Sequence, residues 1–281
     1  MARIEKASWG GANVVWLAAA IGLLGGCGDS GDGDASNSVG GSGGSGGSGA
    51  ASSDGGVYTD GGPQEGGNLD DGSGASGPAQ LVGTLRDFLD SHPDFEGNLG
   101  DDRGLVQHDL GADGKPVYAG GAGTVTTSGQ SNFDQWYRDV PGINMSTAFT
   151  IPLTNTGGNV YSYDNQAFFP IDGQLQGNEG RAHNYHFTFE LHTRFTYKGG
   201  EVFQFTGDDD LFVFINKRLA MDLGGVHGPE SAQADLDDLA QDLEIVVGNI
   251  YDLDFFFAER HTTQSTFRID TTIDNFIPSV Y

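Results

Sequence analysis

The chain has 281 residues, of which 39 are Asp or Glu and 13 are Lys or Arg, so its formal net charge at pH 7 is -26. Binding to phosphate backbones needs clustered Lys and Arg, so this charge balance argues against nucleic acid as a partner. Only one cysteine, Cys27, is present, which excludes a disulfide within these residues. The abundance of Gly, Asp, Phe and Thr favours strands and turns over helices.

The first residues are organised like an export signal. After a short positive start, residues 12–24 form an apolar run that is too short for a comfortable membrane span. The four residues Leu24-Gly25-Gly26-Cys27 follow and resemble the lipobox of bacterial lipoprotein signals, in which the cysteine is lipidated. We therefore expect a lipoprotein signal peptide over residues 1–26 and a membrane anchor on Cys27. The alternative is an ordinary secretory signal that happens to contain a cysteine.

The residue after the cysteine bears on location. Gly28, and not Asp, follows Cys27. By analogy with the sorting rule of enteric bacteria, this predicts a protein of the cell envelope that is lipid-anchored at the outer membrane or cell surface.

Residues 27–80 are rich in Gly, Ser and Asp and include the run GGSGGSGGSG at 40–49. Such a composition cannot bury enough apolar surface to offset the entropy of ordering, so it predicts a disordered tether. A flexible coil of this length would reach about 40 Å on average. The alternative is a low-complexity insertion without a role.

Residues 81–281 consist of short apolar runs separated by Gly, Asn, Asp and Pro, a pattern that indicates one folded domain. The sequence YHFTFELH at 185–192 alternates between apolar and polar residues, which predicts a half-buried strand. The unbroken apolar run at 211–215 predicts a strand that is buried on both faces and lies inside a sheet. Short strands at this spacing predict an all-β fold, an antiparallel β-sandwich or jelly roll with few short helices. Further strands are expected at 202–206, 243–247, 251–258 and 266–271, and one helical stretch at 84–89.

Three consecutive carboxylates, Asp208, Asp209 and Asp210, directly precede the most apolar run of the chain. Adjacent carboxylates repel one another, so without a counter-charge at least one pKa should rise. A bound calcium ion would remove this conflict, and the alternative is an acidic turn whose charges face water. Calcium takes six to eight oxygen ligands, so other loops must contribute. Glu259 and Ser265 are candidates from their position in a later loop.

Longer motifs resemble a known family. The segments HNYHFTFELHTRFTYKGGEVFQFTGDDDLFVFIN, DLGGVH and YDLDFFFAERHTTQSTFRIDT resemble the fibro-slime domain, a relative of the PA14 β-sandwich. The upstream pieces DFLDSHPDFEG, GKPVY, FDQWYRDVPG and FFPIDG resemble the extension that often precedes that domain. The resemblance implies a domain over residues 81–281 with a role in surface adhesion or in binding cellulose-like polymers.

The resemblance also implies a role for the acidic run. In PA14-type adhesins, two consecutive aspartates joined by a cis peptide bond hold a calcium ion at the sugar-binding tip. That pair corresponds to Asp208 and Asp209, whereas Asp210 stands where the PA14 pattern has Gly. Calcium is therefore the expected cofactor, with Asp208, Asp209 and Asp210 as the expected metal ligands.

Several polar residues are expected near the same tip. In the run Glu259-Arg260-His261, Arg260 and His261 could donate to sugar hydroxyls or pair with the aspartate loop. The alternative for this run is a structural salt bridge that joins two loops. A zinc site is disfavoured because the histidines do not form a compact three-ligand pattern. Trp136 could be a core residue or a sugar platform. The expected ligand-binding residues are Glu259, Arg260, His261 and His227.

The sequence shows no Gly-x-Ser-x-Gly elbow, no His-Glu-x-x-His and no phosphate-binding glycine loop, so we expect no enzyme. The resulting hypothesis is a lipid-anchored surface protein that binds polysaccharide or an extracellular matrix polymer through a calcium-dependent loop. One alternative is a structural surface protein whose Asp cluster only stabilises the fold. A less favoured alternative is a polysaccharide hydrolase.

Overall fold

The structure is a computed structural model that describes residues 80–278. The expected signal peptide over residues 1–26, the lipidation of Cys27 and nearly all of the expected tether over 27–80 lie outside these residues. Within the described part of the chain, no helix is both long and apolar enough to cross a membrane.

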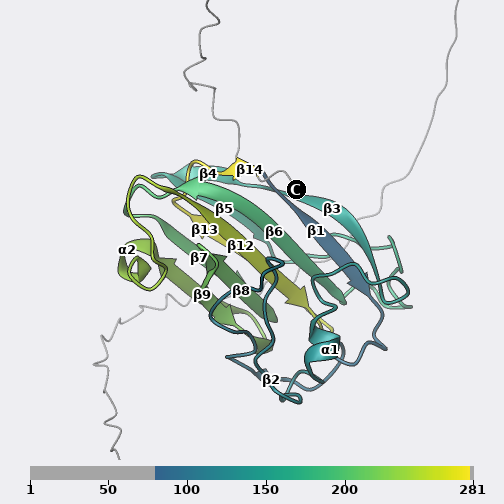
Figure 1. The fold of residues 1–281 in the computed structure, drawn as a ribbon. Coiled ribbons are helices and arrows are strands. Elements are labelled where there is room, and N and C mark those ends of the chain that lie inside the picture. Colours follow the sequence, from purple (N-terminus) through teal and green to yellow (C-terminus); the bar gives the residue numbers. More distant parts are fainter. Residues whose placement is uncertain (1–79, 279–281) are drawn as a thin grey trace, which may run out of the picture. The chain divides into compact units, whose positions relative to one another are not determined.

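The larger of two main sheets contains seven antiparallel strands (Figure 1). The strand β14 (Ile277–Pro278) pairs with β6. Across the sheet, the other six follow the order β3 (Asn144–Pro152), β1 (Gln80–Phe88), β6 (Phe187–Thr196), β12 (Ile250–Glu259), β8 (Asp210–Ile215) and β9 (Arg218–Leu223).

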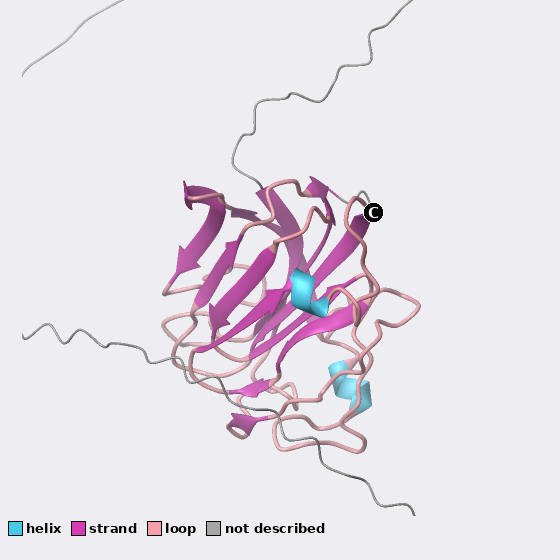
Figure 2. Cartoon of the chain, turned by 90° about the vertical axis from the view of Figure 1, so that its left-hand side faces the viewer, coloured by secondary structure: helices cyan, strands magenta, loops and turns pink. Residues whose placement is uncertain are grey.

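The second sheet is also antiparallel and packs against one face of the first (Figure 2). Its order is β11 (Glu230–Asp235), β7 (Val202–Gly207), β13 (Phe267–Thr271), β5 (Val160–Asn165) and β4 (Thr154–Gly157). Two short strands, β2 (Gly100–Asp101) and β10 (Gly225–Val226), form a separate pair. The helices α1 (Gln130–Phe133) and α2 (Leu236–Leu239) have four residues each. The predicted all-β antiparallel sandwich with few short helices is confirmed.

Phenylalanines from both sheets form the core between them. Phe255 and Phe257 of β12 point towards the smaller sheet, because alternate residues of a strand share a face. Phe257 meets Phe267 with ring centroids 5.1 Å apart, and Phe255 meets Phe205 at 5.8 Å. Both contacts are edge-to-face, an arrangement that aromatic rings favour, and they pack the two sheets together.

The outer face of the larger sheet is also partly covered, by the long connection between β1 and β3. Trp136 and Tyr137 of this connection pack on Phe212 and Phe256 of the sheet in a second apolar cluster. Thr188 on the same face is fully buried and donates a hydrogen bond to the carbonyl oxygen of Trp136. The segment 185–192 is therefore buried on both faces, and the prediction of a half-buried strand is wrong because alternation does not reveal a covering loop.

The predictions for Trp136 and for the apolar run at 211–215 have clear outcomes. Trp136 is a core residue and not a surface platform, since its side chain is buried and its indole N–H donates to Asp94 at 3.1 Å. All residues of β8 are buried, and β8 lies between β12 and β9. The prediction of a fully buried strand inside the sheet is confirmed.

Two predicted elements are wrong. The stretch 84–89 is not helical: most of it belongs to β1, which pairs with β3 on one side and β6 on the other. So short an amphipathic stretch is not stable as an isolated helix, and pairing on both sides decides its conformation. The stretch 243–247 is a turn after α2, closed by the Ile245 N–H, which donates to the Ala240 carbonyl. Its Leu243 and Ile245 are buried, whereas Val246 and Val247 are exposed.

Candidate functional site

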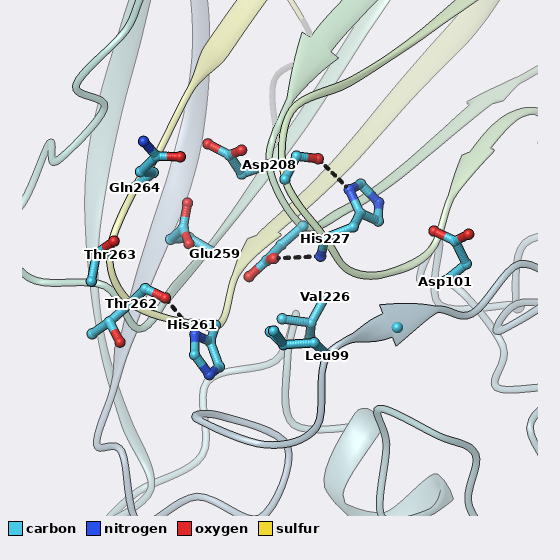
Figure 3. A pocket seen from close by; sticks show the side chains of 13 residues that line it. Leu99, Asp101, Asp208, Val226, His227, Glu259, His261, Thr262, Thr263 and Gln264 are labelled. Atoms are coloured by element: carbon cyan, nitrogen blue, oxygen red, sulfur yellow. Dashed lines mark hydrogen bonds between the residues drawn. The ribbon is translucent and has the colours of Figure 1, made fainter.

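A pocket lies at the end of the sandwich where β7 leads into β8. Asp208 and Asp209 form this connection, and the pairing of Ala258 with Asp210 places Glu259, the last residue of β12, beside it. The pocket has a volume of about 550 Å³. Its wall consists of Leu99, Gly100, Asp101, Asp208, Asp209, Val226, His227, Gly228, Glu259, His261, Thr262, Thr263 and Gln264 (Figure 3).

A glycine allows the acidic connection to lie close to the neighbouring strand. A Cβ atom at Gly207 would lie 2.5 Å from the carbonyl oxygen of Thr266, so only glycine fits there. The Asp208 N–H donates to that same carbonyl at 3.3 Å, and the Thr266 N–H donates to Oδ2 of Asp208 at 2.6 Å. This reciprocal contact fixes the Asp208 carboxylate at the inner wall of the pocket.

Asp209 makes the turn itself. Its φ of 53° lies in the left-handed region, which aspartate tolerates better than most residues. Its carboxylate accepts the His227 N–H at 3.2 Å and the Arg260 N–H at 2.6 Å. The bond between Asp208 and Asp209 is not a cis peptide bond, so the expectation from the resemblance is wrong. The chain turns here through the left-handed conformation of Asp209 instead. Within residues 80–278 the cis peptide bond joins Thr262 and Thr263.

Asp210 points into the interior and pairs with Arg260. Both side chains are fully buried, and the guanidinium Nε donates to Oδ2 of Asp210 while the Gly225 N–H donates to Oδ1 at 2.8 Å. Arg260 also donates to the carbonyl oxygens of Asp94 and Thr126 and lies 4.6 Å from the ring centre of Trp136.

These contacts place two of the expected site residues outside the pocket. Asp210 was expected to bind metal, but both of its oxygens already accept hydrogen bonds inside the protein. Arg260 was expected to bind ligand, but it is buried and forms the structural salt bridge that was its alternative.

Several other oxygens near the pocket lack a hydrogen-bond partner. Neither oxygen of Glu259 nor the hydroxyl of Ser265 forms a hydrogen bond of normal geometry, although the two side chains are neighbours. The Oδ1 atom of Asp208 is likewise buried without a partner. An unsatisfied buried polar group costs about 1–3 kcal/mol, so these oxygens need an explanation.

The pKa values of these buried carboxylates are raised. Burial raises the pKa of Asp209 to about 7, with Arg260 opposing this effect and the charge of Asp210 adding to it. Burial raises the pKa of Glu259 well above its usual range, and the nearby Asp209 adds to it. Burial also raises the pKa of Asp208. The alternative of a solvated acidic turn is therefore wrong, because these side chains are buried and one guanidinium cannot neutralise them all.

The donor set suits a hard cation. The unpartnered atoms of Asp208, Glu259 and Ser265 are all oxygens, from two carboxylates and one hydroxyl. Calcium prefers oxygen ligands. Within residues 80–278, however, no group of three His, Cys, Asp or Glu side chains is arranged to hold a metal ion alone. A cation at this pocket would thus need further oxygens from the backbone, from water or from a ligand.

Two histidines flank the pocket and were both expected to bind ligand. The ring of His227 lies 3.1 Å from the Leu223 carbonyl oxygen and 2.9 Å from that of Gly228. His261 contacts the carbonyl oxygen of Thr262 through Nδ1, while its Nε2 lies 3.7 Å from the Glu96 carboxylate. The structure therefore brings His227, His261 and Glu259 together at the pocket wall.

Asp101 and Glu96 were missed by the sequence interpretation. Asp101 reaches the pocket because β2 pairs with β10, and Gly225 permits a backbone approach that a side chain would block. Glu96 accepts the Thr262 N–H at 3.0 Å and so supports the loop that carries His261. Both residues are far from the acidic run in the sequence, and no local pattern marks them.

Residues 155–275 match the family model of the PA14 domain. Over these residues the chain is similar to the PA14 domain. The PA14 relationship inferred from the sequence motifs is thereby confirmed.

The chain is also similar to proteins of Dictyostelium discoideum. Protein psiD is 44% identical over 192 residues, which are 63% of this chain and 37% of psiD. Protein psiR is 42% identical over 200 residues, which are 65% of this chain and 20% of psiR. The chain thus spans well under half the length of these relatives.

Solved structures similar to the PA14 domain share little sequence with it. The PA14 domain of the MpAFP antifreeze protein is 10% identical, with 69% of this chain and 83% of that chain covered and a TM-score of 0.30. The PA14 sugar-binding domain from an RTX adhesin is 7% identical, with 68% and 89% covered and a TM-score of 0.29. At these scores, ligand preference has to be argued from the residues of this chain.

Proposed function

We propose that the PA14 domain binds a polysaccharide or another matrix polymer at the pocket between Asp208 and Glu259, with calcium as the cofactor. The observation that carries this proposal is the set of buried, unpartnered oxygens of Asp208 and Glu259, two residues that line an accessible cavity. Burial raises the pKa values of Asp208 and Glu259, and the charge of Asp209 adds to the shift of Glu259, so a nearby cation would stabilise both side chains in their charged forms.

The protein residues that would hold calcium are few. Asp208 and Glu259 offer carboxylate oxygens, Ser265 offers a hydroxyl, and Asp209 is already committed to two backbone N–H groups. Calcium takes six to eight oxygens, so several positions would remain for water or for neighbouring hydroxyls of a sugar. Such an incomplete protein shell is suited to a site where the ligand completes the coordination.

The flanking residues would then select the ligand. His227, His261 and Gln264 are polar side chains on the pocket wall, whereas Leu99 and Val226 supply small apolar surfaces. This mixture of a few polar groups with apolar surface is typical of small-ligand sites. We assign no catalytic residue, so the domain is proposed as a binding module and not as an enzyme.

Calcium titration of the full chain after chelation tests the proposal. We expect saturable binding by the parent and no binding by the Asp208→Asn, Glu259→Gln double variant. The matched control is Asp242→Asn, Glu244→Gln, which changes two exposed acids outside the pocket by the same chemistry. An unchanged titration in the first variant would refute the cation site.

A polysaccharide array, with calcium or with chelator, separates the candidate functions. Binding that disappears with chelator supports the adhesive function. If calcium instead raises the melting temperature and no polysaccharide binds, the cluster has a fold-stabilising role, to which the buried Asp210–Arg260 pair would contribute. Release of products from a polysaccharide would identify a hydrolase.

We further propose that a lipid anchor on Cys27 holds the protein at the cell surface. Replacing Cys27 with Ser is expected to move the protein from the membrane fraction to the soluble fraction, because acyl chains supply the binding energy of such anchors. Fractionation with detection of the folded domain measures this, and Ser30→Ala is the control. Retention of the Cys27→Ser variant in the membrane fraction would contradict lipidation.

A further inference from the structure

A second, larger groove lies on the outer face of the seven-stranded sheet, beside the part that the connection between β1 and β3 covers. Its volume is about 920 Å³, within the range of roughly 300–1,000 Å³ that is usual for ligand pockets. It shares no lining residue with the pocket at Asp208. Charged side chains of β6 and β12 form its floor, with Glu190, His192 and Asp254 among them.

The charges of the floor are neutralised from within the protein. Glu190 is nearly buried and lies 3.2 Å from Arg86 and 2.5 Å from Lys115. His192 contacts Asp254 at 2.6 Å. Although burial alone would raise it, the pKa of Glu190 is held at about 2 by His192, Arg86 and Lys115. The floor is therefore a fixed set of hydrogen-bonding groups with little net charge of its own.

Two cations at the groove remain without a counter-charge. Arg194 and Lys217 line the groove, are exposed, and form no ion pair within the described part of the chain. Asp252 lies opposite Arg194 in the strand register, yet the two do not form an ion pair. Every other Lys and Arg in residues 80–278 contacts a carboxylate, so the two exceptions both occur at this groove.

In a chain with a net charge of -26, two cations left unpaired at the same groove are unexpected. Lys217 is held in place by the β8–β9 turn, where it has a φ of 64° and its carbonyl oxygen accepts the Leu110 N–H. Arg194 projects from β6, an interior strand. Asp252 lies between them at one end of the polar floor, because it pairs with Arg194 on β6 and its carbonyl oxygen accepts the N–H of Asn216, the residue before Lys217. Two cations beside a floor of hydrogen-bonding groups suit a ligand with negative groups and hydroxyls.

The strand pairing decides between a sugar chain and a peptide. The groove lies mainly on β1, β6 and β12, whose backbone groups already pair with neighbouring strands, and the edge strand β3 contributes only Ala148. On these three strands a peptide finds no free edge to extend, and the small apolar surface of Val82, Leu110 and Ala148 offers no seam for an amphipathic helix. A polyhydroxyl ligand needs neither feature.

We propose that this groove is a second binding site of the domain and that its ligand is a saccharide carrying isolated carboxylates, of the uronic acid type. Carboxylates would pair with Arg194 and Lys217, and hydroxyls would bond to Glu190, His192 and Asp254. The overall negative charge repels densely charged polyanions, so a sparsely charged chain is favoured. The site is independent of the proposed calcium pocket.

Titration of the full chain with a hyaluronan oligosaccharide, in which uronic acids alternate with neutral sugars, in chelator and moderate salt tests this proposal. We expect the parent to bind, a neutral dextran oligosaccharide not to bind, and the Arg194→Gln, Lys217→Gln variant to bind about tenfold more weakly. The matched control is Lys198→Gln, Arg268→Gln, which removes the same charge from exposed ion pairs outside both pockets and should bind like the parent. Melting temperatures confirm that all variants are folded.

Four results would overturn the proposal: no binding by the parent in chelator, equal binding of the neutral dextran, equal weakening in the control variant, or binding of a short polyglutamate peptide in place of the saccharide. The titrations are made in chelator, so they do not depend on calcium. If the pocket at Asp208 proves not to bind calcium, the saccharide titrations are unaffected. Loss of binding only in the Asp208→Asn, Glu259→Gln variant would assign the saccharide to that pocket instead.

Discussion

Replacing Arg260 with Met is expected to lower the free energy of unfolding by about 3–5 kcal/mol, because the change leaves a buried carboxylate without its counter-charge. Arg260 contacts Asp210 and donates to two main-chain carbonyls, and no water can replace it in that interior. For a domain of about 200 residues this corresponds to a fall in melting temperature of roughly 10 °C. Chemical and thermal denaturation measure the effect.

Two further variants test the cause. Arg268→Met removes a guanidinium from an exposed pair and should change stability by less than about 1 kcal/mol. Adding Asp210→Leu to Arg260→Met removes both buried charges and should recover part of the loss, since replacing a whole buried pair by apolar groups is often nearly neutral. A loss below 1 kcal/mol in Arg260→Met would show that the pair does not hold the loops together.

The acidic pocket should make stability fall as pH rises when calcium is absent. The folded protein raises the pKa of Asp209 from 3.8 to about 7, so between these values the folded state binds more protons than the unfolded chain. The stabilisation is complete below about pH 4 and is lost as pH rises through about 7. One such group in isolation accounts for about 4 kcal/mol. Glu259 and Asp208, whose pKa values are also raised by burial, act in the same direction.

A single substitution separates this effect from general acid titration. In chelator at pH 8, Glu259→Gln is expected to raise the free energy of unfolding by about 1–3 kcal/mol, because an unpartnered buried charge becomes a neutral amide. With calcium at about 100 times its dissociation constant, the parent should instead gain about 2.7 kcal/mol and the variant little. Denaturation across pH 4–8 measures both, with Glu244→Gln as the exposed control. Stability in chelator that rises steadily over this range would contradict the assignment.

The sheet architecture could be predicted because its strands have local patterns. The buried run at 211–215 and the alternation at 185–192 both specify strands before any tertiary contact is known. The error at 84–89 arose because a six-residue stretch reads equally well as a helix turn or a strand, and only pairing with β3 and β6 decides. The covering of the outer face by Trp136 and Tyr137 has no local signal at all.

The candidate site was predictable in part for the same reason. Asp208 and Asp209 stand out because adjacent carboxylates before an apolar strand are electrostatically costly, and they do reach the pocket. Asp210 has the same sequence signal yet faces Arg260, because it is the first residue of β8 and follows the left-handed turn at Asp209. Asp101 reaches the pocket only through pairing of two short strands, which no sequence spacing encodes.

The strand register has a mechanical consequence for a surface protein. Gln80 lies at one end of β1, and Asp87 near its other end pairs with Phe187, which in turn pairs with Glu259 of the pocket (Figure 1). A pull between Gln80 and a ligand in the pocket would therefore act along β1 over a length of about 25 Å. The hydrogen bonds from β1 to β3 and β6 run across that direction, so they would share the load in shear and would not be peeled apart one after another.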